Sequence, residues 1–305
     1  MKNLKFGIEI ETVDLTRGAL AYAIQSAVGG AVVESHGNWH VEDTNRRIWK
    51  VVADASLSGG LRSGEIVSPI LSYEDLETLQ EVVRAVRGAG AHVNQSTGIH
   101  VYVSGDRFDA KSIINLVKLV HKQERLLEHA LRIDERRLGQ YCRPINPAFI
   151  QRLERFRPKT MQEVRDAWYG YRNVNPHRYD ETRYHGLNLN SLFFRGSIEF
   201  RYFNGSLHAG EVKAYVQLAL ALAAKALKSR STSSKRREFS PATAKYDFRV
   251  VLLSLGLIGA EYKTARLHLT KHLAGSAAWK GERRDRRPAV QEPASESEPA
   301  DRAAA

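Results

Sequence analysis

The sequence has almost no cysteine: Cys142 is the only one in 305 residues. A single cysteine cannot form an internal disulfide, and scarce cysteine is typical of proteins in a reducing compartment. Cys142 lies between Tyr141 and Arg143-Pro144, and these neighbours do not form a nucleophile elbow. We therefore expect neither disulfide stabilisation nor cysteine catalysis.

The sequence also lacks any apolar run long enough to cross a membrane, which takes about 20 residues. At the N-terminus, the stretch MKNLKFGIEIE reaches acidic residues before the apolar core of a signal peptide could form. Together these absences predict a cytoplasmic protein without a membrane partner.

Negative charge is in short supply, because 46 lysines and arginines against 34 aspartates and glutamates give a formal net charge of +12. A basic protein attracts polyanions, so nucleic acid is one partner to consider. An ATP site also requires positive charge, and part of the excess falls in the polar stretch Lys235-Arg236-Arg237. The charge alone therefore does not distinguish nucleic-acid binding from nucleotide binding.

Strand-like alternation and helix-like periodicity are mixed along the chain, which indicates an α+β fold with a mainly antiparallel sheet and helices on one face. Residues 133–185 are rich in Arg, Tyr and Pro and predict a long loop around one helix at 160–168. Residues 187–203 predict two strands joined at Arg195-Gly196. The other predicted helices span residues 16–28, 72–86, 110–132, 209–228 and 241–272. The other predicted strands fall within 4–13, 31–53, 65–69 and 92–103, the last range holding a pair of strands.

Composition divides the chain into four segments. A core is followed by a basic polar linker, a helical segment and a tail that is poor in apolar residues, which predicts disorder there. The core spans residues 1–230, the linker 231–240, the helical segment 241–275 and the tail 276–305.

Four predicted strands place charged or imidazole side chains among apolar residues. Alternation in the first strand puts Glu9 and Glu11 on one face, about 6.5–7 Å apart. Glu65, His100 and Glu199 repeat the pattern in later strands. Clustered carboxylates repel each other and require cations, and Mg²⁺ prefers carboxylate oxygens together with substrate phosphates. These residues supply enough ligands for two ions, which can bridge the phosphates of a nucleotide.

Each of these residues also has an ordinary structural interpretation. Glu9 and Glu11 fit the solvated face of an edge strand. His100 fits a buried core histidine, and Glu199 with Arg201 fits an ion pair. The recurrence of the pattern in four segments, beside glycines that permit close approach, favours the metal site.

Five stretches together resemble the amidoligase family, whose members are related to glutamine synthetase and glutamate–cysteine ligase. They follow the family's order over roughly residues 5–210. The stretches are FGIEIE (6–11), DASL with GEIVSP (54–69), GIHVYV (98–103), RYHGLNLNSL (183–192) and SIEFRYFNGSL (197–207).

The resemblance implies a glutamine-synthetase-like fold, in which a curved antiparallel sheet holds ATP and metal ions on its concave face. By motif, Glu9, His100 and Glu199 resemble the ligands of the metal that bridges the ATP phosphates. Glu11 and Glu65 resemble ligands of a second metal near the acceptor carboxylate. The implied cofactors are ATP and two or more Mg²⁺ ions, with Mn²⁺ as a substitute.

The same resemblance assigns roles to four further residues. Asp54 would support the second metal, and Arg201 would contact the transferred phosphoryl group or the substrate carboxylate. Arg183 would steady the ATP phosphates, and Asn190 would orient a substrate or water. The core 1–230 would then be the ATP- and metal-binding ligase unit.

The sequence departs from the family pattern at three positions. Tyr102 stands where relatives often carry a second histidine, Ala55 where glycine is commoner, and Ser206 where threonine is usual. None of the three is among the implied metal ligands, so the departures bear on substrate details.

The implied reaction joins a small-molecule or peptide carboxylate to an amine through an acyl phosphate. The amine must arrive neutral, which calls for a base. Tyr102, Tyr184, His185 and Asp54 are the candidates.

Three other functions remain open at this point. A guanidino-kinase-like phosphotransferase on the same fold would make a phosphorylated product and no amide. A metal-dependent nuclease could use Asp54 and Glu65, but such sites usually carry a lysine where this chain has Val67. A non-catalytic nucleic-acid-binding protein fits the charge but leaves the acidic strands unexplained.

Overall fold

A computed structural model describes residues 1–280 and contains one open sheet of eight strands in that range. The strand order is β2-β3-β4-β5-β1-β6-β8-β7, and every neighbouring pair is antiparallel. The predicted α+β class with an antiparallel sheet is confirmed. The strands are β1 Phe6–Val13, β2 Ala31–Ser35, β3 Asn38–Glu42, β4 Ile48–Val52, β5 Ser63–Val67, β6 Gly98–Ser104, β7 Leu187–Asn188 and β8 Ser197–Asn204.

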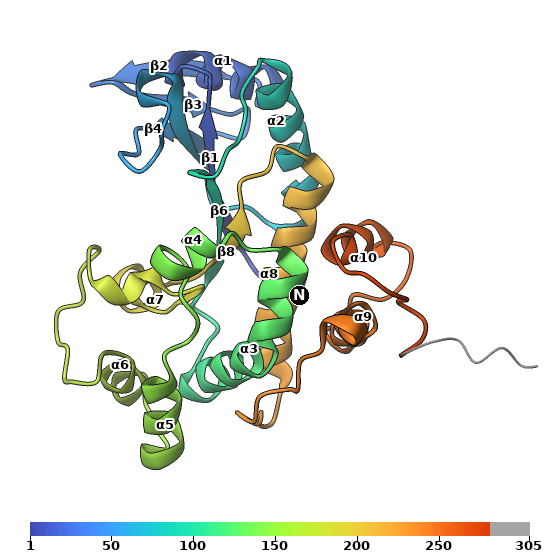
Figure 1. Ribbon diagram of the computed structural model, residues 1–305. Coiled ribbons are helices and arrows are strands. Elements are labelled where there is room, and N and C mark those ends of the chain that lie inside the picture. The colour runs from blue at the N-terminus through green and yellow to red at the C-terminus, as the bar shows by residue number, and fades with distance from the viewer. Residues whose placement is uncertain (281–305) are drawn as a thin grey trace, which may run out of the picture.

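Helices cover one side of this sheet. Figure 1 shows α2, α8 and α3 along one side of β1, β6 and β8, with α9 and α10 outside them. The helices are α1 Arg17–Val28, α2 Leu76–Gly88, α3 Ala110–Leu131, α4 Glu135–Gln140, α5 Pro147–Phe156, α6 Met161–Tyr169, α7 Asn190–Arg195, α8 Ala209–Lys228, α9 Ala244–Ser254 and α10 Lys263–Thr270.

The central strand β1 shows why the two faces of the sheet differ. Phe6, Ile8 and Ile10 are buried in the hydrophobic core beneath the helices. Because successive side chains on a strand point to opposite faces, Glu9 and Glu11 lie on the other face, as the alternation predicts. The apolar half of β1 anchors the strand, and its acidic half is left on the face without this helical layer.

In the segment predicted as two strands over 187–203, a helix replaces most of the first strand. Only the two residues of β7 remain as a strand, and α7 begins after Leu189. The Asn188 side chain accepts a hydrogen bond from the Ser191 N–H and so starts the turn, and Gly196 ends α7 in the left-handed conformation with a φ of 81°. Local capping therefore overrides the apolar alternation that favoured a strand.

Residues 133–185 contain three helices where one was predicted. The predicted helix at 160–168 is α6, whose Thr160 and Glu163 form a capping box. The helices α4 and α5 begin at the caps Asp134 and Asn146, the latter followed by Pro147 at the first helical position.

Two further predicted elements are shorter than expected. The pair of strands predicted over 92–103 is the single strand β6, preceded by an isolated bridge between His92 and Val13. The helix predicted over 241–272 is divided into α9 and α10, with Gly256 and Gly259 in left-handed conformations between them.

The C-terminal helices pack against the core, α9 on α3 and α10 on α8. The division into core, linker and helical segment stays a prediction. The predicted disordered tail, 276–305, falls outside the described residues from position 281 onward. Within the described residues, no helix combines the length and apolar character that a membrane span requires.

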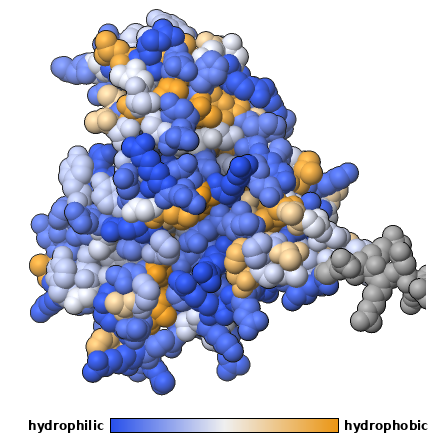
Figure 2. Space-filling model, viewed as in Figure 1, coloured by the Kyte–Doolittle hydropathy of each residue, from blue (hydrophilic) through white to orange (hydrophobic). Residues whose placement is uncertain are grey.

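The face seen in Figure 2 is largely hydrophilic, and its apolar residues gather in several separate areas. This distribution agrees with the large share of charged residues in the sequence. The chemistry that distinguishes the molecule lies in a cavity on the open face of the sheet.

Candidate active site

Strand register brings the predicted acidic residues together. In the antiparallel pairs, Glu11 lies opposite Glu65, and Glu9 lies opposite His100. β8 pairs with β6 on its far side and adds Glu199 to the same region. Because β5, β1, β6 and β8 are adjacent, five side chains that are up to 190 positions apart in sequence converge on one face.

The first group consists of Glu9, His100 and Glu199. The His100 Nδ1 atom lies 3.1 Å from an oxygen of Glu9 and 3.7 Å from an oxygen of Glu199. The Tyr102 hydroxyl also donates a hydrogen bond to Glu9. Two carboxylates and an imidazole thus face one point, with donor atoms within 4.8 Å of one another.

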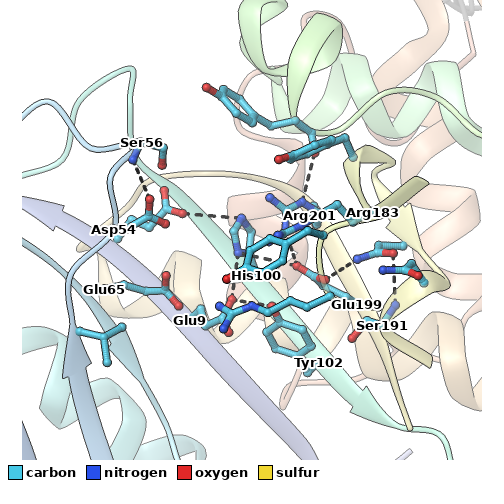
Figure 3. A pocket seen from close by; sticks show the side chains of 18 of the residues that line it. Glu9, Asp54, Ser56, Glu65, His100, Tyr102, Arg183, Ser191, Glu199 and Arg201 are labelled. Atoms are coloured by element: carbon cyan, nitrogen blue, oxygen red, sulfur yellow. Dashed lines mark hydrogen bonds and ion pairs between the residues drawn. The ribbon is translucent and has the colours of Figure 1, made fainter. Parts of the chain in front are cut away.

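The second group consists of Glu11, Asp54 and Glu65, whose carboxylate oxygens also lie within 4.8 Å of one another. The backbone N–H of Gly98 donates to Glu11 at 2.6 Å, and that of Ser56 donates to Asp54 at 2.7 Å. The His100 Nε2 atom is 3.8 Å from Glu11, so the imidazole stands between the two groups. Figure 3 shows Asp54 and Glu65 on one side of His100, with Glu199 and Arg201 on the other.

The carboxyl groups of the second group do not all ionise together. Burial raises the pKa of Glu11 to about 7. Burial, followed by repulsion from Glu9, raises the pKa of Glu65 to about 9. Burial acts to raise the pKa of Asp54 as well, but its hydrogen bonds from Ser56 lower it. Without a cation, protons must therefore neutralise part of this group.

In the first group, in contrast, the pKa values of His100 and Glu199 are lowered, so both side chains are deprotonated. Burial, followed by the charge of Arg201, lowers the pKa of His100 well below its usual value. The imidazole is therefore neutral and has a lone pair for a cation. Burial acts most strongly on Glu199 and would raise its pKa, but Arg201, His100 and Arg195 together lower the pKa and keep the carboxylate ionised.

Buried hydrogen bonds hold Arg201 and Glu199 in place. The Arg201 Nη1 atom is 2.6 Å from Glu199, and its Nε donates to the Tyr141 carbonyl at 3.1 Å. The Asn188 amide donates to the second oxygen of Glu199 at 2.6 Å. Arg137, also buried, donates to the Arg201 carbonyl at 3.2 Å. Buried hydrogen bonds of this kind hold the charged groups in a fixed geometry.

These residues line a cavity of about 460 Å³. Arg183 lines it too, with its guanidinium near the rings of Tyr179 and Tyr184. Asn190 also lines it, and its side chain accepts a hydrogen bond from the Tyr169 hydroxyl and donates to the His177 carbonyl. The structure thus brings all nine predicted site residues to one cavity.

Sequence reasoning missed several cavity residues, among them Arg195, Arg137 and Asn188. The Arg195 guanidinium lies 4.1 Å from the centre of the Tyr102 ring and 3.8 Å from Glu9. The sequence does point to Asn188, because in LNLN it alternates with leucine just as the predicted site residue Asn190 does. It does not point to Arg137 or Arg195, because each lies on a helix that was not predicted.

The structure separates the four candidates for the base. Burial, followed by Glu199 and Glu9, raises the pKa of Tyr102 well above its usual value, so its hydroxyl stays protonated. His185 lies outside the cavity lining and pairs its Nδ1 with the Pro144 carbonyl at 2.7 Å. Asp54 and Tyr184 line the cavity and remain candidates.

The donor atoms of both groups suit hard divalent cations. Carboxylate oxygens dominate, with one imidazole in the first group, and such sets suit Mg²⁺ and Mn²⁺ rather than thiophilic metals. The raised pKa values of Glu11 and Glu65 give an independent sign, because a cation there would replace protons. The residues present therefore fit the metals that the sequence motifs imply.

Comparison with known proteins agrees with the motifs. Residues 2–223 match the model of a protein family described as "Putative amidoligase enzyme". The match includes all eight strands and ends within α8, so α9 and α10 lie outside it. A comparison with curated proteins found no match.

Proposed function

Because this chain belongs to the amidoligase family, we propose that it is an ATP- and Mg²⁺-dependent ligase that joins a carboxylate to an amine. The carrying observation is the convergence of Glu9, His100 and Glu199 with Glu11 and Glu65 on four adjacent strands. The fold proposed with this activity is glutamine-synthetase-like, with catalysis on the open face of the antiparallel sheet and helices on the other.

The two groups of side chains would hold separate ions. Glu9, His100 and Glu199 would hold the ion at the ATP phosphates, and Glu11 and Glu65 the ion nearer the acceptor, with Asp54 beside them. When bound, these ions neutralise charge on the transferred phosphoryl group and on the carboxylates around it.

In the first step, an oxygen of the substrate carboxylate attacks the γ-phosphorus of ATP. The new O–P bond forms as the bond to ADP breaks, which gives an acyl phosphate. Arg201 is held by Glu199 and Tyr141 and offers its remaining N–H groups to the phosphoryl oxygens. Arg183 and Arg195 line the same cavity and supply further positive charge.

In the second step, a neutral amine attacks the acyl carbon, the carbon–oxygen bond to phosphate breaks, and an amide remains. A carboxylate resists this attack because of its own charge and its poor leaving group, and phosphorylation removes both obstacles. The proton lost by the amine passes to a base, for which Asp54 is suited because hydrogen bonds keep it ionised.

The cavity favours small polar acids and short peptides as acceptors. Arg178 lies on the side of Glu65, and Tyr179 and Tyr184 provide flat surfaces beside it. A guanidinium beside the acceptor position pairs well with a carboxylate.

The test is incubation of the full chain with ATP, Mg²⁺ and a panel of amino acids and dipeptides as paired acids and amines. ADP release and product mass are measured together. We expect ADP release that depends on both substrates and a product whose mass equals acid plus amine minus water. A phosphorylated product without an amide would instead identify a phosphotransferase, and DNA binding without ATP turnover would refute the ligase.

A further inference from the structure

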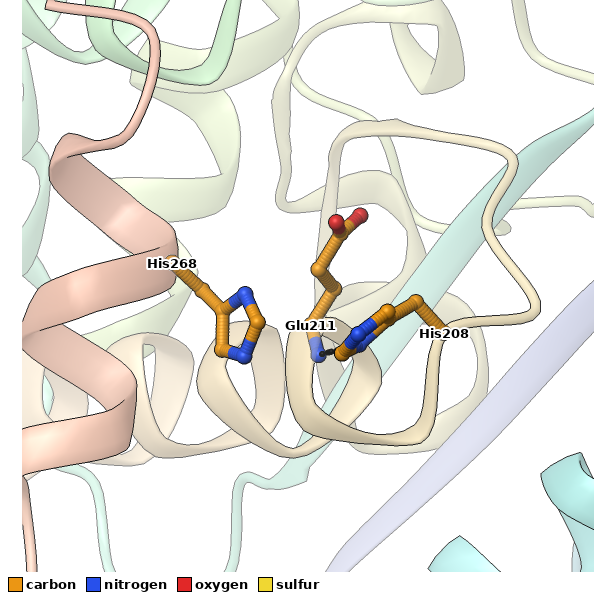
Figure 4. Close-up of side chains that lie close together, drawn as sticks. All are labelled: His208, Glu211 and His268. Atoms are coloured by element: carbon orange, nitrogen blue, oxygen red, sulfur yellow. Dashed lines mark hydrogen bonds between the residues drawn. The ribbon is translucent and has the colours of Figure 1, made fainter.

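A second cluster of metal-binding side chains lies outside the cavity, where α10 meets the start of α8. His208 and Glu211 come from the N-terminal end of α8, and His268 comes from α10. Their donor atoms lie within 4.8 Å of one another, and the two imidazole rings are 4.7 Å apart at their centres. Figure 4 shows the three side chains converging from the two helices.

The surrounding contacts hold this arrangement in place. Without an ion, His208 is the N-cap of α8 and accepts a hydrogen bond from the Glu211 N–H through its Nδ1; because a neutral imidazole has one lone pair, this bond would open when the ring binds an ion. Ser206 donates to Glu211 at 2.9 Å and orients the carboxylate. A Cβ atom on Gly210 would lie 2.6 Å from the His268 Nε2, so the missing side chain is what allows the imidazole to rest against α8.

The chemistry of the cluster differs from that of the cavity. Two imidazole nitrogens and one carboxylate oxygen form a donor set typical of Zn²⁺, whereas the cavity is dominated by carboxylates. In a tetrahedral zinc site, neighbouring donor atoms are about 3.3 Å apart, so modest side-chain rotations would close the cluster around an ion. The Lys271 ammonium contacts the Glu211 carboxylate, so it would compete with an ion for this ligand.

We propose that His208, Glu211 and His268 form a Zn²⁺ site that fastens α10 to the start of α8. His268 lies beyond the residues that match the family model and His208 and Glu211 lie within them, so the site would join the C-terminal helices to the family core. The site is also connected to the catalytic sheet. His208 follows β8 closely, and the intervening Gly205 donates to the carbonyl of Thr97, the residue before β6.

The test is a Zn²⁺ titration of the full chain against a chromophoric chelator, with excess Mg²⁺ present to occupy the carboxylate-rich cavity. The variants are His268→Gln and His208→Asn, the second chosen because asparagine is also a good N-cap and preserves the start of α8. The control is His92→Gln, which alters a histidine whose side chain is 68% exposed and lies outside the cluster.

We expect one Zn²⁺ equivalent in the wild type and in His92→Gln, and at least about 100-fold weaker binding in each cluster variant. Bound Co²⁺ should give visible absorption bands of nitrogen coordination that both cluster variants lose. Zn²⁺ should also raise the melting temperature of the wild type but not of His268→Gln. Equal Zn²⁺ affinity in the wild type and both cluster variants, or no tight equivalent in the wild type, would overturn the proposal. Neither result would touch the ligase activity, which is assayed separately.

Discussion

Glu9 and Glu11 are two residues apart on β1, yet their side chains belong to different groups. Glu9 contacts His100 and Tyr102, whereas Glu11 accepts from the Gly98 N–H and shares its group with Glu65. The pleat of the strand puts both carboxylates on one face and still separates them by one repeat. A single strand can therefore serve two neighbouring ion positions.

The first prediction concerns Glu9. Glu9→Gln keeps an acceptor for the Tyr102 hydroxyl but removes the charge that a cation would require. We expect substrate-dependent ADP release to fall by about 100-fold or more, with an unchanged far-ultraviolet circular dichroism spectrum. Glu34→Gln, at an exposed glutamate on β2, should leave turnover unchanged. Full turnover in a folded Glu9→Gln protein would contradict the assignment of Glu9 to the nucleotide ion.

Among single residues, the sequence predicted those site residues that follow the two-residue period of a strand. Glu9, Glu11, His100 and Glu199 were found because charged groups stand out among apolar neighbours. Arg195 could not be found in this way, because its position over the Tyr102 ring depends on the packing of α7 against β8. Packing between residues that are far apart in sequence leaves no periodic pattern from which it could be predicted.

β7 is the shortest strand of the sheet, and Gly186 allows it to lie close to β8. Gly186 precedes β7, and its carbonyl accepts a hydrogen bond from the Arg201 N–H at 2.7 Å. A Cβ atom on Gly186 would lie 2.1 Å from the ring of Tyr202. The strand can therefore approach β8, and place Asn188 on Glu199, only without a side chain at position 186.

The second prediction follows from this contact. Gly186→Ala should destabilise the protein by about 1–3 kcal/mol, because the buried Tyr202 ring cannot move away without disturbing the core. The measurement is urea unfolding. The matched control is Gly139→Ala in α4, where an added Cβ meets nothing within 4 Å and should leave stability equal or slightly higher. Equal stability of Gly186→Ala and Gly139→Ala would refute the packing argument.

The third prediction concerns α10 and its lysine. Lys271→Gln removes the ammonium that contacts Glu211, so Zn²⁺ should bind about three- to ten-fold more tightly in the chelator competition. Lys263→Gln, at the exposed start of α10, should bind Zn²⁺ like the wild type. Weaker binding in Lys271→Gln than in Lys263→Gln would show that the lysine supports the cluster rather than competing with the ion.

Elements with a long period were predictable, and short capped helices were not. The helices α3 and α8 agree with their predicted ranges because each presents a continuous apolar face to the core. The helix α7 has only six residues, and the alternating letters LNLN at 187–190, which end at its first residue, favour a strand. Its identity depends on the hydrogen bond from the Ser191 N–H to the Asn188 side chain and on the conformation of Gly196, which only the folded backbone reveals.

For the whole molecule, the cluster of carboxylates makes stability depend on pH and on cations. The pKa of Glu65 rises to about 9 and that of Glu11 to about 7, both first because of burial. Both values exceed those of an unfolded glutamate, so the folded state binds more protons between about pH 5 and 9. The stability that these two groups contribute must then decrease as the pH rises through this range unless a cation replaces the protons.

The fourth prediction tests this linkage by urea unfolding at pH 6 and pH 8. In EDTA, the wild type should be less stable at pH 8 than at pH 6, and saturating Mg²⁺ should restore more stability at pH 8. Glu65→Gln cannot lose a proton, so it should show a smaller decrease in EDTA and a smaller gain from Mg²⁺. An equal pH dependence in the wild type and Glu65→Gln would remove Glu65 from the linkage.

The most direct test of the proposed chemistry follows an oxygen atom. The enzyme is given ATP, Mg²⁺, the amine and the accepted carboxylic acid labelled with ¹⁸O in its carboxylate, and the released phosphate is analysed by mass spectrometry. If an acyl phosphate forms, one ¹⁸O atom passes from the acid to inorganic phosphate for each amide made. Amide formation with unlabelled phosphate would contradict carboxylate phosphorylation in this active site.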